Sequence, residues 1–382
     1  MGYVAVSGGR EAIDASLNLQ ELRRIQSGRV IDTQLVQESL PDLVEQVQSE
    51  GSLWCPAIAA TAIKQATGSV EEAVFLVRAY RSTLERLYTS RTIDTRTLRA
   101  DRRISAAFKD IPGGQILGAT RDYSHRLIAF DLDDETPESA RERQAQIVGE
   151  LANAAAAFEN DSTGKGDAGC LPKVSDYLRS IDLLPTFEID DAAPADITQT
   201  PLSFPAPRSA ILQALTRGLT QAVIAIGYAA IRGFGLLHPT VGELRRGAAA
   251  ITIDAPGNEG ASEEDAYYLG SIPVCEVENI IVTDEEDNGV HRSSLDLGYG
   301  LVMGSNESKA IAMSVLDSTL RSDDPRYPTQ DQEFVLTHID SVEATGFISH
   351  LKLPHYVTFQ SKLDSALRSR KQAENAAESK GE

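Results

Sequence analysis

The sequence has few cysteines and little positive charge, and these two shortages exclude several classes of protein. Its 382 residues include three cysteines, Cys55, Cys170 and Cys275, and no CxxC pair. An odd number of widely separated cysteines excludes a disulfide framework and a zinc ribbon, so we expect each thiol to be a small buried or half-buried hydrophobic group. The formal charge of −20 argues against nucleic-acid binding, which normally requires a basic face.

Long apolar segments are also absent. The longest apolar run, residues 222–231, has ten residues, whereas a membrane-spanning helix needs about 20. The first ten residues contain no stretch typical of a signal peptide. We therefore expect a cytoplasmic protein without a membrane contact. With 42 % apolar and 24 % charged residues, the chain has the composition of a globular protein that is long enough for one large domain or two.

Hydrophobic patterning predicts an α+β fold that is rich in helices, with short strands and hairpins and a helical N-terminal part. Helical or helix-compatible patterns cover 11–25, 71–88, 102–110, 140–158, 209–235 and 306–320, and strand-like patterns cover 3–6, 248–254, 278–283 and 298–304. The stretch 209–235 is long enough for one helix or two. Ser305 or Asn306 is the expected N-cap of the helix that follows.

Composition divides the chain into four regions. They are a helix-rich N-terminal region at 1–130, a variable connecting segment at 131–207, a mixed α/β region at 208–363 and a charged tail at 364–382. Gly164-Lys165-Gly166 lacks the upstream glycine of a P-loop, so we exclude one. Twelve acidic residues and one arginine lie between Asp254 and Asp296, and we interpret this stretch as a solvated surface.

The sharpest chemical pattern is the pair His350 and His355. On a continuous helix this spacing would turn the rings about 140° apart, but Pro354 disfavours a regular helix here. A bent segment would let both imidazoles bind one ion, and imidazole suits Zn, Fe or Ni. Water, His338, a carboxylate or another chain would have to complete such a site. The alternative is a pair of surface or helix-capping histidines.

A second pattern combines cations with a glycine turn. Successive glycines allow backbone N–H groups to form an anion-binding nest, and flanking Arg and Lys side chains can hold phosphate oxygens. The candidate phosphate-binding residues are Arg102, Arg103, Lys109, Gly113 and Gly114. The alternative is a helix and a turn with exposed basic side chains.

Two further segments carry weaker patterns. Residues 298–309 combine a glycine-rich strand with a helix N-terminus, which is a common phosphate-binding geometry, but structural packing explains the glycines equally well. Residues 232–245 bring Arg232, His238, Glu243 and Arg245 close together in sequence, and a loop between a helix and a strand is the simplest explanation.

Eight segments, taken in this order, resemble one family, the PhnI subunit of the bacterial carbon–phosphorus lyase system. The matching stretches are Tyr3–Ile13, Ala73–Arg81, Arg102–Gln115, Asp122–Leu127, His238–Glu243, Gly298–Gly304, Asp331–Leu336 and Gly346–Val357. The last one is specific and contains both histidines of the pair. Residues 131–201, 284–287 and the tail match poorly, and no family property is carried over to them.

The resemblance implies a reaction. With PhnG, PhnH and PhnL, the family joins an alkylphosphonate to the ribose C1′ of ATP, adenine leaves, and the product is a ribose 1-alkylphosphonate 5-triphosphate, such as ribose 1-methylphosphonate 5-triphosphate. Alone, the family is associated with purine nucleosidase activity on ATP or GTP. The resemblance also implies two central copies in a core complex and a zinc ion at the interface with PhnJ, held by the histidines that match His350 and His355. The iron–sulfur cluster belongs to PhnJ, and this chain lacks the cysteine triad that such a cluster needs.

Displacement at C1′ passes through an oxocarbenium-like state. It requires an acid for the leaving purine and cations for the triphosphate. From residue type and proximity in sequence, we expect His125 or Asp122 to act as the acid or the orienting base. A non-catalytic assembly scaffold, which contributes metal ligands at the PhnJ interface, is the alternative function.

Overall fold

The structure is a computed structural model that forms two compact units, each assembled from separated segments of the chain. Unit 1 comprises Met1–Leu87, Glu188–Pro239 and Gly298–Glu382, and unit 2 comprises Tyr88–Phe187 and Thr240–Leu297. The described residues are 9–161, 170–186, 192–235, 238–254, 257, 265–287, 290–322, 325–353 and 355–378.

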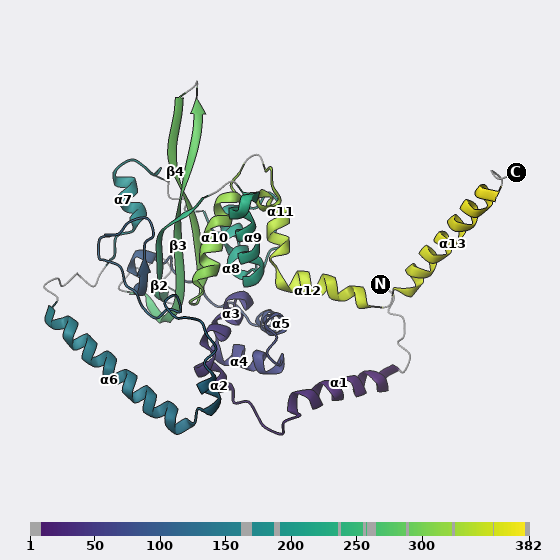
Figure 1. The fold of residues 1–382 in the computed structure, drawn as a ribbon, viewed down its shortest axis with the longest axis horizontal. Coiled ribbons are helices and arrows are strands. Elements are labelled where there is room, and N and C mark those ends of the chain that lie inside the picture. Colours follow the sequence, from purple (N-terminus) through teal and green to yellow (C-terminus); the bar gives the residue numbers. More distant parts are fainter. Residues whose placement is uncertain are drawn as a thin grey trace. The chain divides into compact units, whose positions relative to one another are not determined.

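Unit 1 is built mainly from helices. Its described helices are α1 (Gly9–Ile25), α2 (Thr33–Ser39), α3 (Pro41–Gly51), α4 (Pro56–Gln65), α5 (Val70–Arg81), α8 (Arg208–Arg217), α9 (Thr220–Ala229), α10 (Glu307–Thr319), α11 (Gln332–His338), α12 (Ser341–Ser349) and α13 (Tyr356–Glu378) (Figure 1). Several begin at a side-chain cap that accepts a hydrogen bond from a first-turn N–H, which satisfies one of the donors left open at a helix start. These caps are Asp32, Ser69, Asn306, Asp331 and Asp340.

Helices α2 to α5 bury a shared apolar core. Val47 and Val74 are fully buried in it. Gly51 permits the close approach of α3 to α5, because a Cβ atom there would lie 2.5 Å from Cγ1 of Val77. The helices are short, so this tertiary burial rather than intrinsic propensity stabilises them.

The end of strand β4 (Val290–Met303) packs closely against α10 within unit 1. A Cβ atom at Gly298 would lie 2.2 Å from the carbonyl oxygen of Ser314, and one at Gly300 would lie 2.1 Å from that of Ala310. The glycines of this segment therefore serve backbone packing, which is the simpler of the two explanations for the motif.

Charged groups are buried or half-buried where several helices of unit 1 meet. The guanidinium of Arg78 donates to the backbone oxygen of Glu50 at 2.9 Å, to Asp340 at 2.7 Å and to the backbone oxygen of Arg217 at 3.0 Å. Nearby, the fully buried Lys309 of α10 donates to the backbone oxygens of Thr216 at 2.7 Å and Gly218 at 2.6 Å. Burial lowers the pKa of Lys309 to about 8.

Unit 2 contains most of a four-stranded antiparallel sheet, whose last strand runs on from Leu297 into a segment of unit 1. Its strands β1 (Arg99–Ile104), β2 (Thr240–Ile253), β3 (Tyr267–Asp287) and β4 lie in the order β1-β2-β3-β4. Helix α7 (Val174–Ser180) packs on this sheet and buries Val174 and Leu178 in a small apolar cluster. Helix α6 (Pro137–Asp161) also belongs to unit 2.

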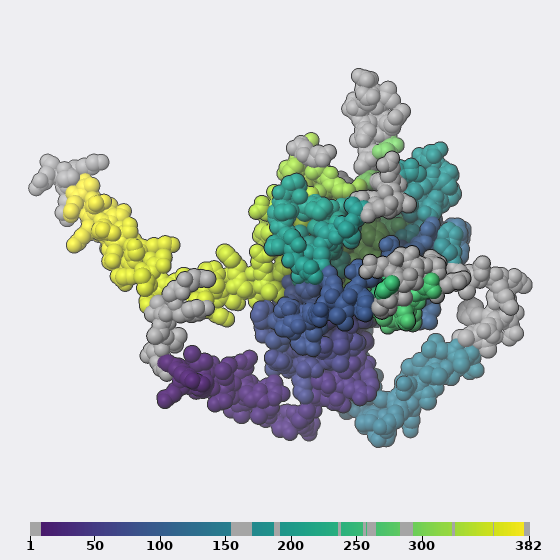
Figure 2. Space-filling view, turned by 180° about the vertical axis from the view of Figure 1, so that it is seen from behind, coloured from purple at the N-terminus to yellow at the C-terminus, as the bar shows by residue number. Residues whose placement is uncertain are grey.

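Three long helices are exposed. No residue of α1 is buried, and the described side chains of α6 and α13 are all exposed. In Figure 2, α13 is the yellow helix and α1 the purple one. Large apolar residues lie on α13 at a spacing of three or four, which gives this helix an apolar stripe on one side. They are Tyr356, Phe359, Leu363 and Leu367.

Among the described residues, no single helix has the length and apolar composition to cross a bilayer. One bent pair, Arg208–Arg217 with Thr220–Phe234, meets these two criteria together.

The predicted α+β class is confirmed, and α1, α6 and α10 cover the predicted ranges. The stretch 209–235 forms two helices, α8 and α9, followed by a π-helical turn at Ala230–Phe234. Helix α5 ends at Arg81 rather than at Tyr88. The predicted strand at 3–6 and Gly164–Gly166 lie outside the described residues.

Three of the expectations from the sequence are wrong. Residues 102–110 are not helical, because β1 pairs with β2 and this long-range pairing overrides local propensity. The strands are not short, since β2, β3 and β4 have 14, 21 and 14 residues. Cys275 is buried and Cys55 half-buried as expected, but Cys170 is exposed.

Gly300→Ala should destabilise unit 1 by about 2–3 kcal/mol, because the new methyl group would overlap the α10 backbone. Gly346→Ala is the matched control, since a Cβ atom there meets nothing within 4 Å and α12 gains a better helix former. Urea denaturation of both variants measures the difference. Equal stability of the two variants would contradict the close packing of β4 on α10.

Lys309→Met should reduce the rise in stability with pH between pH 8 and 10.5. In the wild type, the folded chain loses this proton near pH 8, whereas the unfolded chain keeps it to about 10.5. The unfolded state therefore binds more protons in this window, and the free energy of unfolding rises with pH by up to about 3 kcal/mol. Urea denaturation on either side of the window measures this rise. An equal rise in both proteins would show that Lys309 is not the group responsible.

Candidate functional site

A row of charged side chains crosses three strands of the sheet in unit 2. The antiparallel register places Arg103 of β1 opposite Arg245 of β2, and Arg245 opposite Glu276 of β3. Glu243 and Glu278 form the next pair on the same face, since residues two apart on a strand point to the same side. All five side chains are buried.

Glu243 joins three elements through its two oxygens. Its Oε1 accepts from Nε of Arg103 at 2.5 Å and from Nε of Arg245 at 2.7 Å. Its Oε2 accepts from the backbone N–H of Val174 at 2.8 Å, at the start of α7. A single carboxylate therefore fixes β1, β2 and α7 to one another.

Lys173 completes the cluster beside β3. Its ammonium lies 2.8 Å from Oε1 of Glu276 and 3.1 Å from Oε1 of Glu278. Burial lowers the pKa of Lys173, but the attraction of Glu278 and Glu276 outweighs this effect and raises it above its ordinary value. Burial also disfavours the charged form of Glu278, and because this group is an acid its pKa is raised. We call the six residues the sheet charge cluster; it consists of Arg103, Lys173, Glu243, Arg245, Glu276 and Glu278.

Arg103, a predicted phosphate ligand, lies at the centre of this cluster. It is completely buried, and besides Glu243 it donates to the backbone oxygens of Pro112, Gly114 and Pro172. A phosphate would have to displace these acceptors. In this structure Arg103 holds the glycine turn and the segment before α7 against the sheet.

The glycine turn has the expected backbone conformation but is closed by its own hydrogen bond. Gly113 and Gly114 have φ values of +83° and +74°. A Cβ atom at Gly113 would lie 2.6 Å from Cδ2 of Leu171, so a side chain does not fit. The N–H of Gly114 donates to the backbone oxygen of Ile111 at 2.8 Å, and this donor therefore does not contribute to a nest for an anion.

Arg102 points to the other side of β1, because adjacent residues of a strand face opposite ways. It is buried and donates at 2.6 Å to both the backbone oxygen of Leu117 and Oδ2 of Asp122. The structure thus brings Arg102 and Asp122 together but does not bring Arg102 and Arg103 to one ligand. The remaining predicted residues of this region, Lys109 and His125, are exposed.

The predicted metal pair lies where two helices of unit 1 are interrupted. Helix α12 ends at Ser349, a single 3₁₀ turn covers His350–Lys352, and α13 begins at Tyr356. The expected break in the helix is therefore present. It sets the rings of His350 and His355 5.6 Å apart between centroids, with an angle of 62° between their planes.

Both imidazoles are held in the way that metal-binding histidines usually are. Nδ1 of His350 contacts the backbone oxygen of Phe347, and Nδ1 of His355 contacts that of Leu353 at 2.6 Å. A carbonyl acceptor at Nδ1 fixes the tautomer that leaves Nε2 able to bind a metal. Zn–N bonds of about 2.1 Å and a tetrahedral angle would set the centroids about 5 Å apart, and the observed separation of 5.6 Å is close to this value.

Two ligands do not complete a zinc site. In the part of the chain that the structure describes, no group of three or more His, Cys, Asp or Glu side chains has the arrangement of a metal site. His338 instead contacts the backbone oxygen of Phe334 and packs on the ring of that residue. Further ligands at the histidine pair would thus come from water, from another chain or from residues outside the described part of this one.

Sequence reasoning missed half of the sheet charge cluster. The sequence analysis placed Glu243 and Arg245 close together in a loop and assigned them no partner. It did not single out Lys173, Glu276 or Glu278. The interpretation of 254–296 as a solvated surface is wrong for Glu276 and Glu278 of β3, which are buried. The available signal was the alternation of charges two apart, at 243 and 245 and at 276 and 278.

The family model and the curated relatives that match this chain point to one family, and each match covers nearly the whole chain. Residues 2–373 match the family model described as "Bacterial phosphonate metabolism protein (PhnI)". The chain is 42 % identical over 370 residues to the putative C-P lyase subunit protein HtxH of Stutzerimonas stutzeri, with 95 % of each chain covered. It is 41 % identical over 370 residues to the alpha-D-ribose 1-methylphosphonate 5-triphosphate synthase subunit PhnI of Escherichia coli (strain K12), with 95 % of this chain and 96 % of the relative covered. The protein of the same name from Rhizobium meliloti (strain 1021) is 38 % identical over 385 residues, with 98 % and 96 % covered.

Glu243→Ala should destabilise the protein by about 3–5 kcal/mol, because two buried guanidinium groups and a helix N–H lose their shared acceptor. Glu374→Ala is the control, since Glu374 forms an exposed i, i+4 pair with Arg370 on helix α13 and its loss should change nothing measurable. Thermal and urea denaturation compare the two variants. A stable Glu243→Ala protein would show that the cluster does not hold the sheet and α7 together.

Proposed function

The chain belongs to the PhnI family of bacterial phosphonate metabolism proteins, and from this membership we propose that it transfers an alkylphosphonate to C1′ of ATP together with PhnG, PhnH and PhnL. Its relatives are named as subunits, so the chain is a component of a multi-subunit carbon–phosphorus lyase complex. The observation that carries the proposal is 41 % identity over 95 % of the chain to a synthase subunit.

In the proposed reaction the bond between C1′ and the purine nitrogen breaks, and a bond forms between C1′ and a phosphonate oxygen. Adenine leaves with a proton, and the product is ribose 1-alkylphosphonate 5-triphosphate. When the chain acts alone, water takes the place of the phosphonate, and the same step is a purine nucleosidase reaction on ATP or GTP. The subunit works in the cytoplasm.

Within this proposal, the segment 109–125 supplies the polar groups of the nucleotide site. Lys109 and His125 are exposed and therefore open to a ligand. Asp122 is half-exposed, and Arg102 holds its carboxylate at 2.6 Å. Lys109 contributes charge for the triphosphate, and His125 or Asp122 handles the purine proton. Arg102, Arg103, Gly113 and Gly114 contribute by holding the segment in place.

The histidine pair binds zinc at a contact with another subunit, PhnJ. The support is the fixed Nδ1 atoms of His350 and His355 together with the apolar side chains around them. Phe347, Ile348 and Leu351 are each more than 60 % exposed, which is typical of a surface that a partner covers. His350 and His355 would hold the zinc ion, which would supply a Lewis acid or a point that orients a ligand. Two copies of the chain lie at the centre of the complex.

A non-catalytic scaffold is the second candidate function. The observation that favours it is that the described residues bring two histidines, and no third His, Cys, Asp or Glu ligand, to this position. In that case the chain positions its partners and contributes ligands, while another subunit carries out the displacement at C1′.

Adenine release from ATP plus methylphosphonate tests the proposal. The complex with PhnG, PhnH and PhnL should release adenine in proportion to the phosphonate consumed, and the isolated chain should release it slowly by hydrolysis. The His350→Ala, His355→Ala double variant should lose bound zinc, measured by elemental analysis of the PhnJ complex. His238→Ala is the matched control, because it removes one exposed histidine outside the pair.

Each outcome separates the candidates. Partner-dependent release in both the wild type and the double variant supports the transfer reaction and assigns the metal to a later step. Release that the double variant loses, in an intact complex, assigns the metal to the nucleotide chemistry. The absence of adenine release under every condition contradicts the enzymatic proposal and leaves the scaffold.

A further inference from the structure

The histidine pair follows α12, a helix that unit 1 holds by its first turn. Ser341 at the start of α12 is buried, and Val342 packs against the apolar core of α2 to α5. The residues from Glu343 to Ile348 are all exposed, and His350 comes directly after the helix. Because a helix is stiff, the direction of this first turn determines where His350 and His355 lie relative to the rest of unit 1.

One ion pair fixes this first turn. Nη1 of Arg78 in α5 lies 2.9 Å from Oδ1 and 2.7 Å from Oδ2 of Asp340. The Asp340 side chain is also the N-cap of α12, since its Oδ1 accepts from the N–H groups of Val342 and Glu343, each at 3.0 Å. A single carboxylate therefore both caps α12 and attaches it to α5.

Arg78 is itself held firmly, so it provides a rigid point of attachment. Its side chain is 11 % exposed, and it also donates to backbone oxygens of α3 and α8, those of Glu50 at 2.9 Å and Arg217 at 3.0 Å. Burial alone would raise the pKa of Asp340, but the attraction of Arg78 and the hydrogen bonds from Arg78 and Glu343 outweigh it and lower the pKa below its ordinary value. The pair is therefore fully charged at neutral pH.

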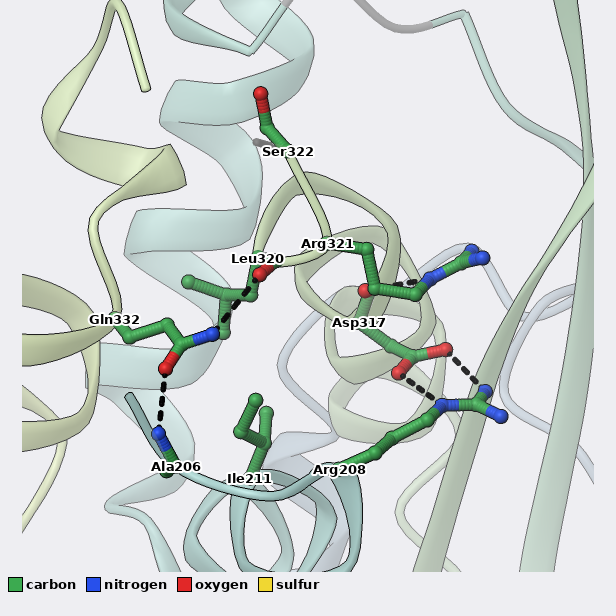
Figure 3. Close-up of a pocket in the computed structure, with 8 residues that line it drawn as sticks. All are labelled: Ala206, Arg208, Ile211, Asp317, Leu320, Arg321, Ser322 and Gln332. Carbon is green, nitrogen blue, oxygen red and sulfur yellow. Dashed lines mark hydrogen bonds and ion pairs between the residues drawn. The ribbon is translucent and has the colours of Figure 1, made fainter. Parts of the chain in front are cut away.

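Another ion pair of unit 1 joins helices that many other contacts also hold. At a pocket of about 240 Å³, Asp317 of α10 accepts from Nε of Arg208 at 3.1 Å and from Nη2 at 2.8 Å (Figure 3). Nine residues of α10 are buried, so the position of α10 does not depend on this pair alone. Of the nine residues of α12, all of which the structure describes, Ser341 alone is buried. The direction of α12 therefore depends far more on the contact between Arg78 and Asp340.

We infer that Arg78 and Asp340 are positioning residues for the histidine pair, because their ion pair fixes the direction in which α12 carries it. This role rests on the proposed contact of the pair with PhnJ. The turn between α12 and α13 already sets the rings of His350 and His355 close together, so the ion pair is not required for their local geometry. It determines instead where the two imidazoles meet a partner that binds unit 1.

Asp340→Asn in the full-length chain tests this inference, because asparagine caps a helix as well as aspartate does but has no charge to attract Arg78. Asp331→Asn is the matched control, since Asp331 is the N-cap of α11 and accepts from the N–H of Phe334. Hydrogen exchange measured by mass spectrometry should be at least fivefold faster over residues 343–349 in Asp340→Asn. It should be unchanged there in Asp331→Asn.

Two binding measurements separate the placement of the histidine pair from its local geometry. In Asp340→Asn, calorimetry with Ni²⁺ on the isolated chain should give an affinity within twofold of the wild type. The affinity of the same variant for PhnJ in the presence of zinc should fall at least fivefold. Gly300→Ala destabilises the same unit at the contact of β4 with α10, and its affinity for PhnJ should stay within twofold of the wild type.

Each outcome decides between the possibilities. Unchanged exchange in Asp340→Asn, or faster exchange with an unchanged affinity for PhnJ, overturns the inference. A loss of Ni²⁺ binding, or an equal loss of PhnJ affinity in Gly300→Ala, also overturns it, because local geometry or general stability would then be the cause. If the wild type does not bind PhnJ, the proposed partner is wrong, whereas faster exchange in Asp340→Asn still supports the ion pair as the attachment of α12.

Discussion

The carboxylate of Glu243 lies between two buried guanidinium groups and the first N–H of α7, and the arrangement of unit 2 depends on it. Removing such charges from water costs several kcal/mol for each ion, and this cost is recovered only when every partner is well placed. Here both carboxylate oxygens have donors, and Arg103 shares its remaining donors among three backbone oxygens. The glycine turn at 113–114 and the segment before α7 are thereby tied to the sheet, which fixes the base of the segment that carries Asp122 and His125.

In unit 1, charged side chains pair with backbone oxygens at the ends of helices. Lys309 and Arg78 are placed where helix ends expose backbone oxygens, and their hydrogen bonds satisfy these acceptors inside the protein. The same unit exposes apolar side chains along α12 and α13, on either side of the histidine pair. A rigid charged interior together with an exposed apolar surface suits a subunit, since such a surface is stable in water mainly when a partner covers it.

The sequence was sufficient for features that depend on local chemistry. The sequence predicts Ser305 or Asn306 as a cap because either side chain can reach the next turn, and the structure shows that it is Asn306; the interruption between His350 and His355 follows from Pro354. Features that depend on distant residues were missed. Arg103 contacts Glu243 across 140 residues, and Lys173 contacts Glu276 across 103. No local pattern distinguishes these charges from solvated ones, so Arg103 was assigned to phosphate and Glu276 to a surface.

Phosphorus NMR of the reaction with methylphosphonate tests the central claim, that this family member joins a phosphonate to C1′ of a nucleotide, most directly. With ATP and the partner subunits present, the account predicts a new phosphonate resonance that correlates with the ribose H1′ proton, together with an intact triphosphate. Free adenine and an unchanged methylphosphonate resonance would show hydrolysis alone and would contradict the account.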